Sequence, residues 1–315
     1  MSNPASSPPP PLFRFPPWRP ATLATFVLAL VGGLSVVALL AALTHPTGPV
    51  RDLRVLADPD PDPHLIGVAK PRPAYAPTRP EVGRSDLPPA DFISWAILDH
   101  TTGVVIGSET LTETSTTASM IKVWLVADYL RLATEAGRTP SPERLRQFSL
   151  IIRDSHNGYT QTLFQELGGG TASIDRLIAI CGLTDSSPAS GSWSNTLLSA
   201  RDTARMGACL ADGRAAGPAW TDWLLSEMRQ VRGLGDFGIR HALPDDQRAT
   251  IAIKNGWVIR PDGSWHVSCL AVGDTWSMGI LTRYPADLGY DQLGHQRGAE
   301  ICQTLAARYL PGFVN

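Results

Sequence analysis

Residues 44–90 contain eleven prolines, including the repeat Asp-Pro-Asp-Pro-Asp-Pro at 58–63, and this limits where a packed fold can form. Proline fixes φ and lacks a backbone N–H, so a segment this rich in proline favours a semi-extended linker over helices or strands. The 225 residues at 91–315 are enough for one globular body with a substantial buried core. We therefore predict a linker at 44–90 and a single folded domain at 91–315.

Residues 21–43 form a run of 23 residues without a charged side chain. About 20 apolar residues suffice to cross a bilayer, whereas the apolar part of a cleaved signal has only about 7–15. Ala41-Ala42 leaves cleavage open as the alternative, but the length favours a retained anchor. Arg14 and Arg19 precede the run and no acidic residue does, so residues 1–20 are expected to be a cytoplasmic tail. We predict a single-pass cell-membrane protein whose body is extracytoplasmic.

The charge balance argues against a nucleic-acid partner. The chain has 27 basic and 29 acidic side chains, a formal net charge of −2, and no basic surface is indicated. Its seven histidines show no spacing typical of metal ligands, so we assign no metal and no cofactor.

The hydrophobic pattern of the body predicts strands at both ends and helices in the middle. Tight turns at 99–103 and 261–263 join successive strands, which favours an antiparallel sheet. The predicted fold is α+β, with the last helix on one face of the sheet, the central helices in a second lobe, and a cleft between sheet and lobe. The predicted strands are 92–98, 104–109, 250–259, 266–272 and 276–284, and the predicted helices are 118–136, 141–183 (broken at 168–170), 200–212, 218–229 and 291–310.

All four cysteines lie in the body and none is near the uncharged run, so no lipid-attachment site is indicated. Disulfides are permitted outside the membrane, and four cysteines allow three pairings. We predict Cys181–Cys209 and Cys269–Cys302, because each pair falls within one lobe on elements that can pack together. Buried free thiols are the alternative.

Ser119 and Lys122 form a Ser-x-x-Lys sequence at the start of the predicted helix 118–136. Residues three apart share a helix face, so the lysine amine can lie beside the serine hydroxyl. A serine hydroxyl is a poor nucleophile until a base takes its proton, and a lysine can act as that base when burial lowers its pKa. The helix is apolar on nearly all sides, which predicts such burial. By itself the motif is more often a surface serine with an ordinary lysine.

Two further motifs follow in order, Ser155-His156-Asn157 and Lys254-Asn255-Gly256. With the order of strands and helices, these motifs resemble those of the class A β-lactamase and penicillin-binding serine enzymes. The resemblance covers nearly all of 91–315 and implies a β-lactamase/transpeptidase-like α+β fold. Its further points are the opening hairpin, the segment 239–244 before the last motif, and Glu166-Leu-Gly-Gly after the second.

The resemblance implies roles in acyl transfer for four side chains. Ser119 would be acylated, and Lys122 would take or shuttle its proton. The Ser155 hydroxyl would pass a proton to the leaving nitrogen, and Asn157 would hydrogen-bond the substrate amide and Lys122.

The resemblance also implies a substrate-binding strand. Lys254 would keep the site electropositive and help to bind a substrate carboxylate, with Asn255 and Gly256 beside it. The backbone N–H groups of Ser119 and Trp257 would form the oxyanion hole if Trp257 continues the strand.

The sequence departs from the family in two ways. Asn255 replaces the usual Thr or Ser, and an amide can still donate to a carboxylate. The loop at 182–196 contains no glutamate, although the family's hydrolytic glutamate lies there, and Asp185 is its only acid. Glu166 lies before that loop, and a cap or solvent-facing role is expected for it. Deacylation is therefore predicted to be slow.

Other candidate residues have competing structural interpretations. Arg240 or Arg260 can bind a carboxylate, but a structural ion pair is the stronger expectation. Trp193 and Trp257 can line the cleft or pack in the core. His156 occupies a variable slot of its motif, and we expect its side chain to point away.

The predicted function is a membrane-anchored serine hydrolase that is acylated on Ser119 by β-lactams or peptidoglycan-type peptides. A D-Ala-D-Ala-type carboxypeptidase is the alternative within the family. A catalytically weak surface protein that binds cell-wall peptide is the alternative from another class.

Overall fold

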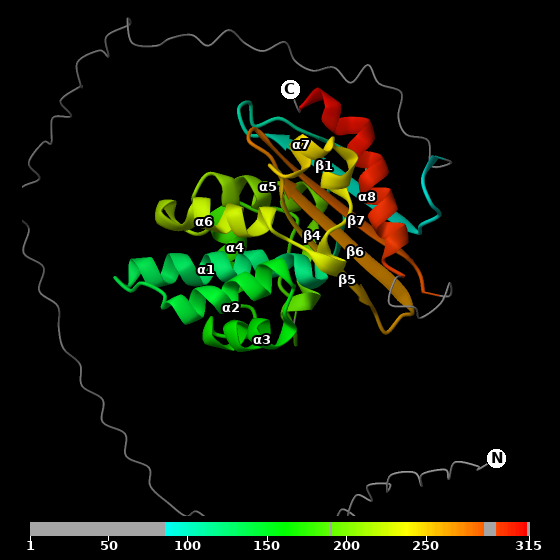
Figure 1. Cartoon of the computed structure of the whole chain (residues 1–315). Helices are drawn as coiled ribbons and strands as arrows, with labels where there is room; N and C mark the ends of the chain where they lie inside the picture. Colours follow the sequence, from blue (N-terminus) through cyan, green and yellow to red (C-terminus); the bar gives the residue numbers. More distant parts are fainter. Residues whose placement is uncertain (1–85, 190, 287–293, 314–315) are drawn as a thin grey trace, which may run out of the picture. The chain divides into compact units, whose positions relative to one another are not determined.

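An antiparallel sheet of five strands, in the order β2-β1-β7-β6-β5, forms the framework of the body (Figure 1). The computed structural model describes residues 86–189, 191–286 and 294–313. The strands are β1 Phe92–Asp99, β2 Val105–Gly107, β5 Ala252–Ile259, β6 Ser264–Val272 and β7 Trp276–Pro285. The predicted hairpin and the three later strands are confirmed. The sheet order leaves β5 at an edge, and this edge carries the Lys254-Asn255-Gly256 motif.

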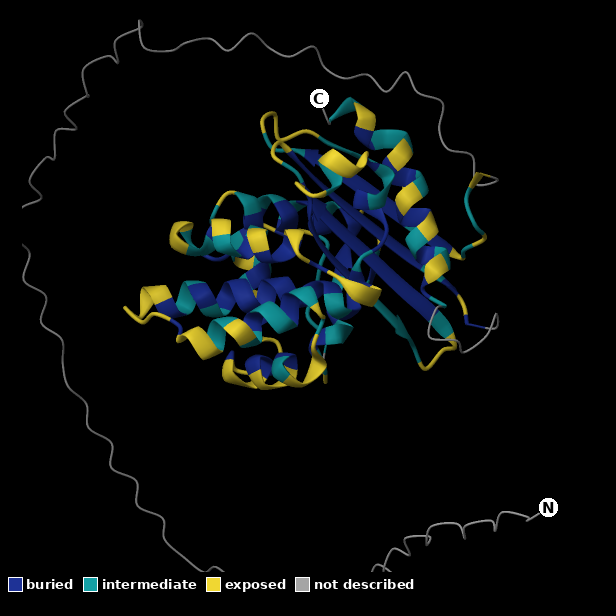
Figure 2. Cartoon of the chain, viewed as in Figure 1, coloured by how far each residue is buried: buried dark blue, intermediate teal, exposed yellow. Residues whose placement is uncertain are grey.

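Helices cover both faces of this sheet, which explains why its strands are apolar along most of their length (Figure 2). Helix α5 (Ala200–Ala211) packs on one face, where a Cβ at Gly279 would lie 2.6 Å from the Thr203 side chain. Helix α8 (Gln296–Tyr309) packs on the other face, where Gly298 contacts Val267. The prediction that the last helix covers the sheet is confirmed.

Helix α1 (Lys122–Glu135) lies at the centre of the helical region and contacts α2, α3, α4 and α6. Its first turn is the 3₁₀ helix η2 (Ala118–Ile121), so the predicted helix 118–136 is confirmed with a tighter start. The surrounding helices are α2 Pro142–Arg153, α3 Asn157–Glu166, α4 Ala172–Cys181 and α6 Pro218–Arg229.

The predicted helical stretch 141–183 has one break more than expected. The glycines 168–170 separate α3 from α4, as predicted, but residues 154–156 also separate α2 from α3. Ser155 has φ of +56°, which no α-helix accommodates, and the His156 side chain then caps α3 by accepting from the Tyr159 N–H. The extra break places Ser155 at a corner between two helices.

Short elements complete the body, and the sequence pattern did not indicate them. Three-residue strands β3 (Thr114–Thr116) and β4 (Leu197–Ser199) pair with each other just before η2. The remaining short helices are η3 Trp193–Asn195, η4 Gly233–Gly235, η5 Ile239–Ala242, α7 Asp245–Arg248 and η6 Leu310–Gly312.

Both predicted disulfides are confirmed. Cys181–Cys209 joins α4 to α5 with a Cα–Cα distance of 5.4 Å, and Cys269–Cys302 joins β6 to α8 with 6.6 Å. Both distances lie in the range that a disulfide spans.

The predicted tail 1–20, anchor 21–43 and most of the linker 44–90 lie outside the described residues. Within the described residues, no helix combines the length and the apolar character needed to cross a membrane.

Candidate active site

Ser119 lies half-buried in η2, against the edge strand β5. The residue before it, Ala118, has φ of +46°, a conformation that costs a non-glycine residue about 1–3 kcal/mol and is common at functional sites. A Cβ on Gly256 would lie 2.4 Å from the Thr117 carbonyl oxygen and 2.6 Å from the Ser119 nitrogen. Only glycine permits this contact, so Gly256 sets how closely β5 approaches the nucleophile.

Lys122 is fully buried at the first position of α1, one turn after Ser119. Its Nζ donates to the Ser155 carbonyl oxygen, to Ser155 Oγ at 3.2 Å and to Asn157 Oδ1 at 2.7 Å. The same Nζ lies 4.8 Å from the centroid of the Trp193 ring. Burial lowers the pKa of Lys122 to about 7, so a large fraction of the amine is neutral near neutral pH.

Lys254 is fully buried on β5 and faces the same serine. Its Nζ donates to Ser155 Oγ at 3.1 Å and to the Asn255 carbonyl oxygen at 2.8 Å. Burial and then the nearby charge of Lys122 hold the pKa of Lys254 well below the ordinary lysine value. One serine hydroxyl therefore lies between two buried amines from different parts of the chain.

Two ion pairs hold Ser155 at its corner. Arg153 donates to both carboxylate oxygens of Glu227 on α6, each at 2.6 Å. Arg232 donates to both oxygens of Asp154 at 2.7 and 2.8 Å. Bidentate arginine–carboxylate contacts fix geometry as well as contributing energy. Sequence reasoning missed these four residues, and the only available signal was the charged pair that precedes the motif serine.

Asn255 differs from its expected role. Its side chain is buried, and its Nδ2 donates to the carbonyl oxygens of Gly235 at 3.0 Å and Phe237 at 2.8 Å. An amide nitrogen has two N–H donors, so both are used within the protein. The structure makes Asn255 an anchor for the segment 235–237 in place of a donor toward a substrate carboxylate.

Trp257 follows Gly256 and continues β5, as the predicted oxyanion hole requires. Its ring stacks on His295, with centroids 5.0 Å apart and planes at 28°, and meets the edge of Phe237 at 5.7 Å. Side chains alternate along a strand, so Asn255 and Trp257 share one face while Lys254 and Gly256 share the other.

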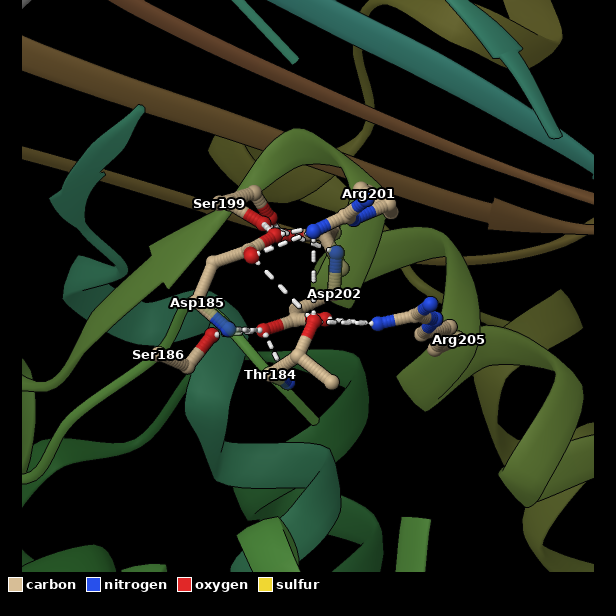
Figure 3. Close-up of polar contacts among 8 residues, drawn as sticks. Thr184, Asp185, Ser186, Ser199, Arg201, Asp202 and Arg205 are labelled. Carbon is tan, nitrogen blue, oxygen red and sulfur yellow. Dashed lines mark hydrogen bonds and ion pairs between the residues drawn. The ribbon is translucent and has the colours of Figure 1, made fainter. Parts of the chain in front are cut away.

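Asp185, the one acid of the loop 182–196, lies in a dense polar network with Asp202 of α5 (Figure 3). Asp185 accepts from Ser199 Oγ at 2.8 Å and from two guanidinium nitrogens of Arg201, at 2.5 and 3.0 Å. Burial raises the pKa of Asp185, but the hydrogen bonds from Arg201 and Ser199 outweigh it, and the pKa lies below its ordinary value. Asp202 binds the backbone N–H groups of Thr184 and Asp185, so both carboxylates fasten the loop.

Glu166 is engaged elsewhere. It forms an ion pair with Arg144 of α2, and its side chain is 42% exposed. The expectation of a solvent-facing structural role is confirmed.

The remaining candidates have structural contacts. Arg240 donates to Asp236 at 2.8 Å and to the carbonyl oxygens of Arg229 and Val231. Arg260 donates to Thr116 Oγ1, Asn195 Oδ1 and the Ser194 carbonyl oxygen, which are neutral acceptors in place of the expected ion-pair partner. His156 caps α3 and stacks on Tyr159. Among the described residues, no group of three or more His, Cys, Asp or Glu side chains could hold a metal ion.

The geometry supplies the parts that serine acyl transfer needs. The Ser119 hydroxyl lies at a helix start, a buried amine that is partly neutral at pH 7 lies one turn away, and the Ser155 hydroxyl links that amine to a second one. The site residues from the three motifs do converge, with the exception that the Asn255 side chain faces away from Lys254 and Gly256.

No family model matches the chain. It is 29% identical over 203 residues to proteins named "Putative lipoprotein LppW" from Mycobacterium bovis and Mycobacterium tuberculosis. The match covers 62% of this chain and 64% of those proteins, so the chain spans less than two thirds of the length of the curated relatives it matches.

Solved structures with a similar fold include an ancestral class A β-lactamase, at a TM-score of 0.54 and 17% identity. The class A β-lactamase from Mycobacterium abscessus has a TM-score of 0.53 and 15% identity, and a β-lactamase from Streptosporangium roseum has 0.54 and 15%. Each match covers 70% of this chain and, in the same order, 94%, 94% and 92% of the other chain. The body described here has the fold of the class A β-lactamases.

Proposed function

We propose that this chain is an active-site serine hydrolase of the β-lactamase and penicillin-binding type. Ser119 is acylated quickly, and the acyl group is released from it slowly. The single observation that carries the proposal is the position of Ser155 Oγ, 3.2 Å from Lys122 Nζ and 3.1 Å from Lys254 Nζ. Two buried lysines that converge on one hydroxyl are costly to stability, and a proton path gives them a purpose.

The acylation step moves one proton along this path, from the Ser119 hydroxyl to the leaving nitrogen. Ser119 Oγ attacks the carbonyl carbon of the donor, and its proton passes to the neutral Lys122 amine. The carbon–nitrogen bond then breaks, and the proton moves by way of Ser155 Oγ to the leaving nitrogen. The oxyanion is stabilised by the backbone N–H groups of Ser119 and Trp257. The product is an ester on Ser119 with a free amine on the cleaved donor.

Release of the acyl group needs a base that directs water at the ester. The loop 182–196 supplies no glutamate, its Asp185 is bonded to Arg201 and Ser199, and Glu166 pairs with Arg144. Slow release follows because both of these carboxylates, Asp185 and Glu166, are already bonded to protein groups. The same arrangement suits a D-Ala-D-Ala-type peptidase that acts on cell-wall stem peptides, which is the alternative donor class.

Intact mass spectrometry after incubation with a labelled penicillin tests the proposal. We expect a stable adduct that peptide mapping places on Ser119, and no adduct on the Ser119→Ala variant. Fast loss of the adduct contradicts slow release. Failure of every β-lactam and stem-peptide analogue to label Ser119 favours the alternative of a surface protein that binds cell-wall peptide without turnover.

We further propose that residues 21–43 anchor the protein in the cell membrane with the body outside. The uncharged run, the two disulfides and the name of the LppW relatives support an extracytoplasmic, membrane-associated location. The full chain should stay with membranes after an alkaline carbonate wash, whereas a variant that begins at residue 44 behind a cleaved signal should be released. A soluble mature protein that begins after residue 42 contradicts this topology.

A further inference from the structure

The outer face of β5 next to Ser119 presents an aromatic group where recognition of a substrate carboxylate was expected. Trp257 is half-buried, and its neighbours Phe237 and His295 are almost fully buried beneath it. The residue before Trp257 is Gly256, which touches the backbone of Ser119. Consecutive Cα atoms are 3.8 Å apart, so the Trp257 backbone lies beside Ser119, and its indole extends from the β5 edge on the face opposite to Gly256.

The cationic side chains near this strand are already committed to protein acceptors. Lys254 is buried and bonded to Ser155 and to a backbone carbonyl. Arg240 donates to Asp236 and two carbonyl oxygens, and Arg260 donates to three neutral acceptors. Lys254 and Arg240 are also buried, so a substrate carboxylate that arrives from solvent does not reach an exposed charge on either of them.

Asn255 does not offer its side-chain amide to a substrate carboxylate, and it has a structural role instead. Its amide donates to the carbonyl oxygens of Gly235 and Phe237, and this holds the segment 235–237 against β5. A Cβ at Gly235 would lie 4.0 Å from the Trp257 ring, so the segment borders the indole. The polar side chain of β5 thus supports the aromatic group.

An exposed apolar side chain adjoins this segment. Leu234 is 54% exposed, and Leu234 and Val104 are the large hydrophobic side chains that stand out as exposed in the described part of the chain. Leu234 precedes Gly235 in η4, so it lies at the border of the Trp257 face. Apolar surface that is exposed beside a reacting centre favours an apolar part of a ligand.

We propose that Trp257, supported by Phe237 and bordered by Leu234, selects the acyl donor by an apolar or aromatic contact, and that a donor carboxylate contributes little. The preferred donors carry an uncharged aromatic or apolar group beside the scissile bond. This inference rests on the proposed acylation of Ser119 and specifies its substrate class.

A donor with a free carboxylate and the same donor with that carboxylate esterified test the role of the charge. The second-order rate constants for acylation of Ser119 are measured with benzylpenicillin and with its methyl ester. We expect values within about 3-fold of each other. A hydrogen bond to a charged group contributes about 1.5–3 kcal/mol, so an ester that reacts about 10–150-fold more slowly overturns the inference.

Variants of the indole test the aromatic contact. Trp257→Ala should raise the concentration needed for half-maximal acylation by about 10-fold with an aromatic donor while the maximal rate changes less, and Trp257→Phe should restore most of the loss. Trp220 on α6 is a matched control, since it is equally half-buried and bonds Thr134 at the far end of α1. Trp220→Ala should leave acylation unchanged. Equal losses in Trp257→Ala and Trp220→Ala, or a loss in the maximal rate alone, overturn the aromatic contact.

A fluorophosphonate, which reacts with activated serines with little recognition, separates the two levels of the proposal. If the fluorophosphonate and benzylpenicillin label Ser119 but the methyl ester of benzylpenicillin labels it slowly, only the donor preference is refuted. Absence of labelling by all three reagents refutes the proposed function, and the inference with it.

Discussion

The two polar regions that flank Ser119 are built on opposite electrostatic principles. Around Ser155 the protein buries two lysines without a carboxylate among their hydrogen-bond partners, and burial lowers the pKa of both. In the loop 182–196 it neutralises charge with charge, because Asp185 pairs with Arg201 and Asp202 pairs with Arg205 (Figure 3). The first region favours neutral lysine amines, and the second favours the ionised form of Asp185.

This difference in pKa determines where proton transfer can occur. A group whose pKa lies near ambient pH exchanges protons readily, whereas a carboxylate with a lowered pKa that accepts several hydrogen bonds is a poor base. The region around Ser155 is therefore suited to proton transfer, whereas the acids of the other region hold the loop in place.

Lys122→Met should slow acylation of Ser119 by about 10²–10⁴-fold, because the variant lacks the base nearest in sequence to the nucleophile. In the wild type, the acylation rate should rise with pH through about 7 and then level off. The sign follows from the pKa of about 7, since the amine is protonated and inactive below it and neutral above it. Stopped-flow acylation over pH 5.5–9 measures both effects.

The control for this variant is its stability. Methionine has a similar shape and needs no hydrogen bonds, so Lys122→Met should unfold at the same or a higher denaturant concentration. If Lys122→Met acylates within tenfold of the wild-type rate, or keeps the rise in rate near pH 7, Lys122 is not part of the proton path.

Much of the fold and part of the site were predictable from the sequence. The hairpin at 92–107, the later strands and α1 follow from hydrophobic spacing and turn residues, and the disulfides follow from which elements share a lobe. The three motifs in their order, together with the family that they resemble, predicted that Ser119, Lys122, Ser155 and Lys254 lie in one site.

Backbone geometry and long-range contacts were beyond the sequence. Neither the positive φ of Ala118 and Ser155 nor the contact of Gly256 with η2 follows from local propensity, because tertiary packing imposes them. Asn255 was expected to face a substrate, but the carbonyl groups that it binds lie 18 and 20 residues earlier. A substitution in a motif is interpretable only when its partners are known.

Asp185→Asn should lower the free energy of unfolding by about 1–3 kcal/mol, because it leaves Arg201 without its carboxylate in a half-buried place. Acylation of Ser119 and release of the adduct should each change less than about 3-fold, since this acid serves structure. The measurements are urea unfolding and adduct kinetics. Asp212→Asn is the matched control, because its ion pair with Arg214 is about half exposed and should matter by less than about 0.5 kcal/mol. Release that slows strongly in Asp185→Asn would make the loop catalytic.

His266 extends the preference for neutral bases to the strand β6. Its ring bonds Ser115 and Thr116 just before η2, and burial, followed by the charges of Arg260 and Arg283, lowers its pKa to about 4. The folded pKa lies below the unfolded value of about 6.5. The contribution of the neutral His266 to the free energy of unfolding is therefore complete above pH 6.5 and is lost as pH falls toward 4. Allowing for partial screening by solvent, unfolding at pH 5 should be easier than at pH 7 by about 1–2 kcal/mol. His266→Gln should flatten that difference, and an unchanged pH dependence in the variant would contradict the assignment.

Glu166→Gln should have the smallest effect, and it tests whether any acid near the loop escapes the structural role. Glu166 is 42% exposed and pairs with Arg144, and exposed ion pairs contribute about 0–1 kcal/mol. We therefore expect the free energy of unfolding to change by less than about 0.5 kcal/mol, and the rate at which the Ser119 adduct is released to change by less than about 2-fold. Turnover of a chromogenic cephalosporin, followed with the purified body, is the sensitive readout. Rapid turnover by the wild type that disappears in Glu166→Gln would show that this carboxylate leaves Arg144 to activate water. Slow release would then be refuted, and Glu166 at the end of α3 would belong with the groups that transfer protons.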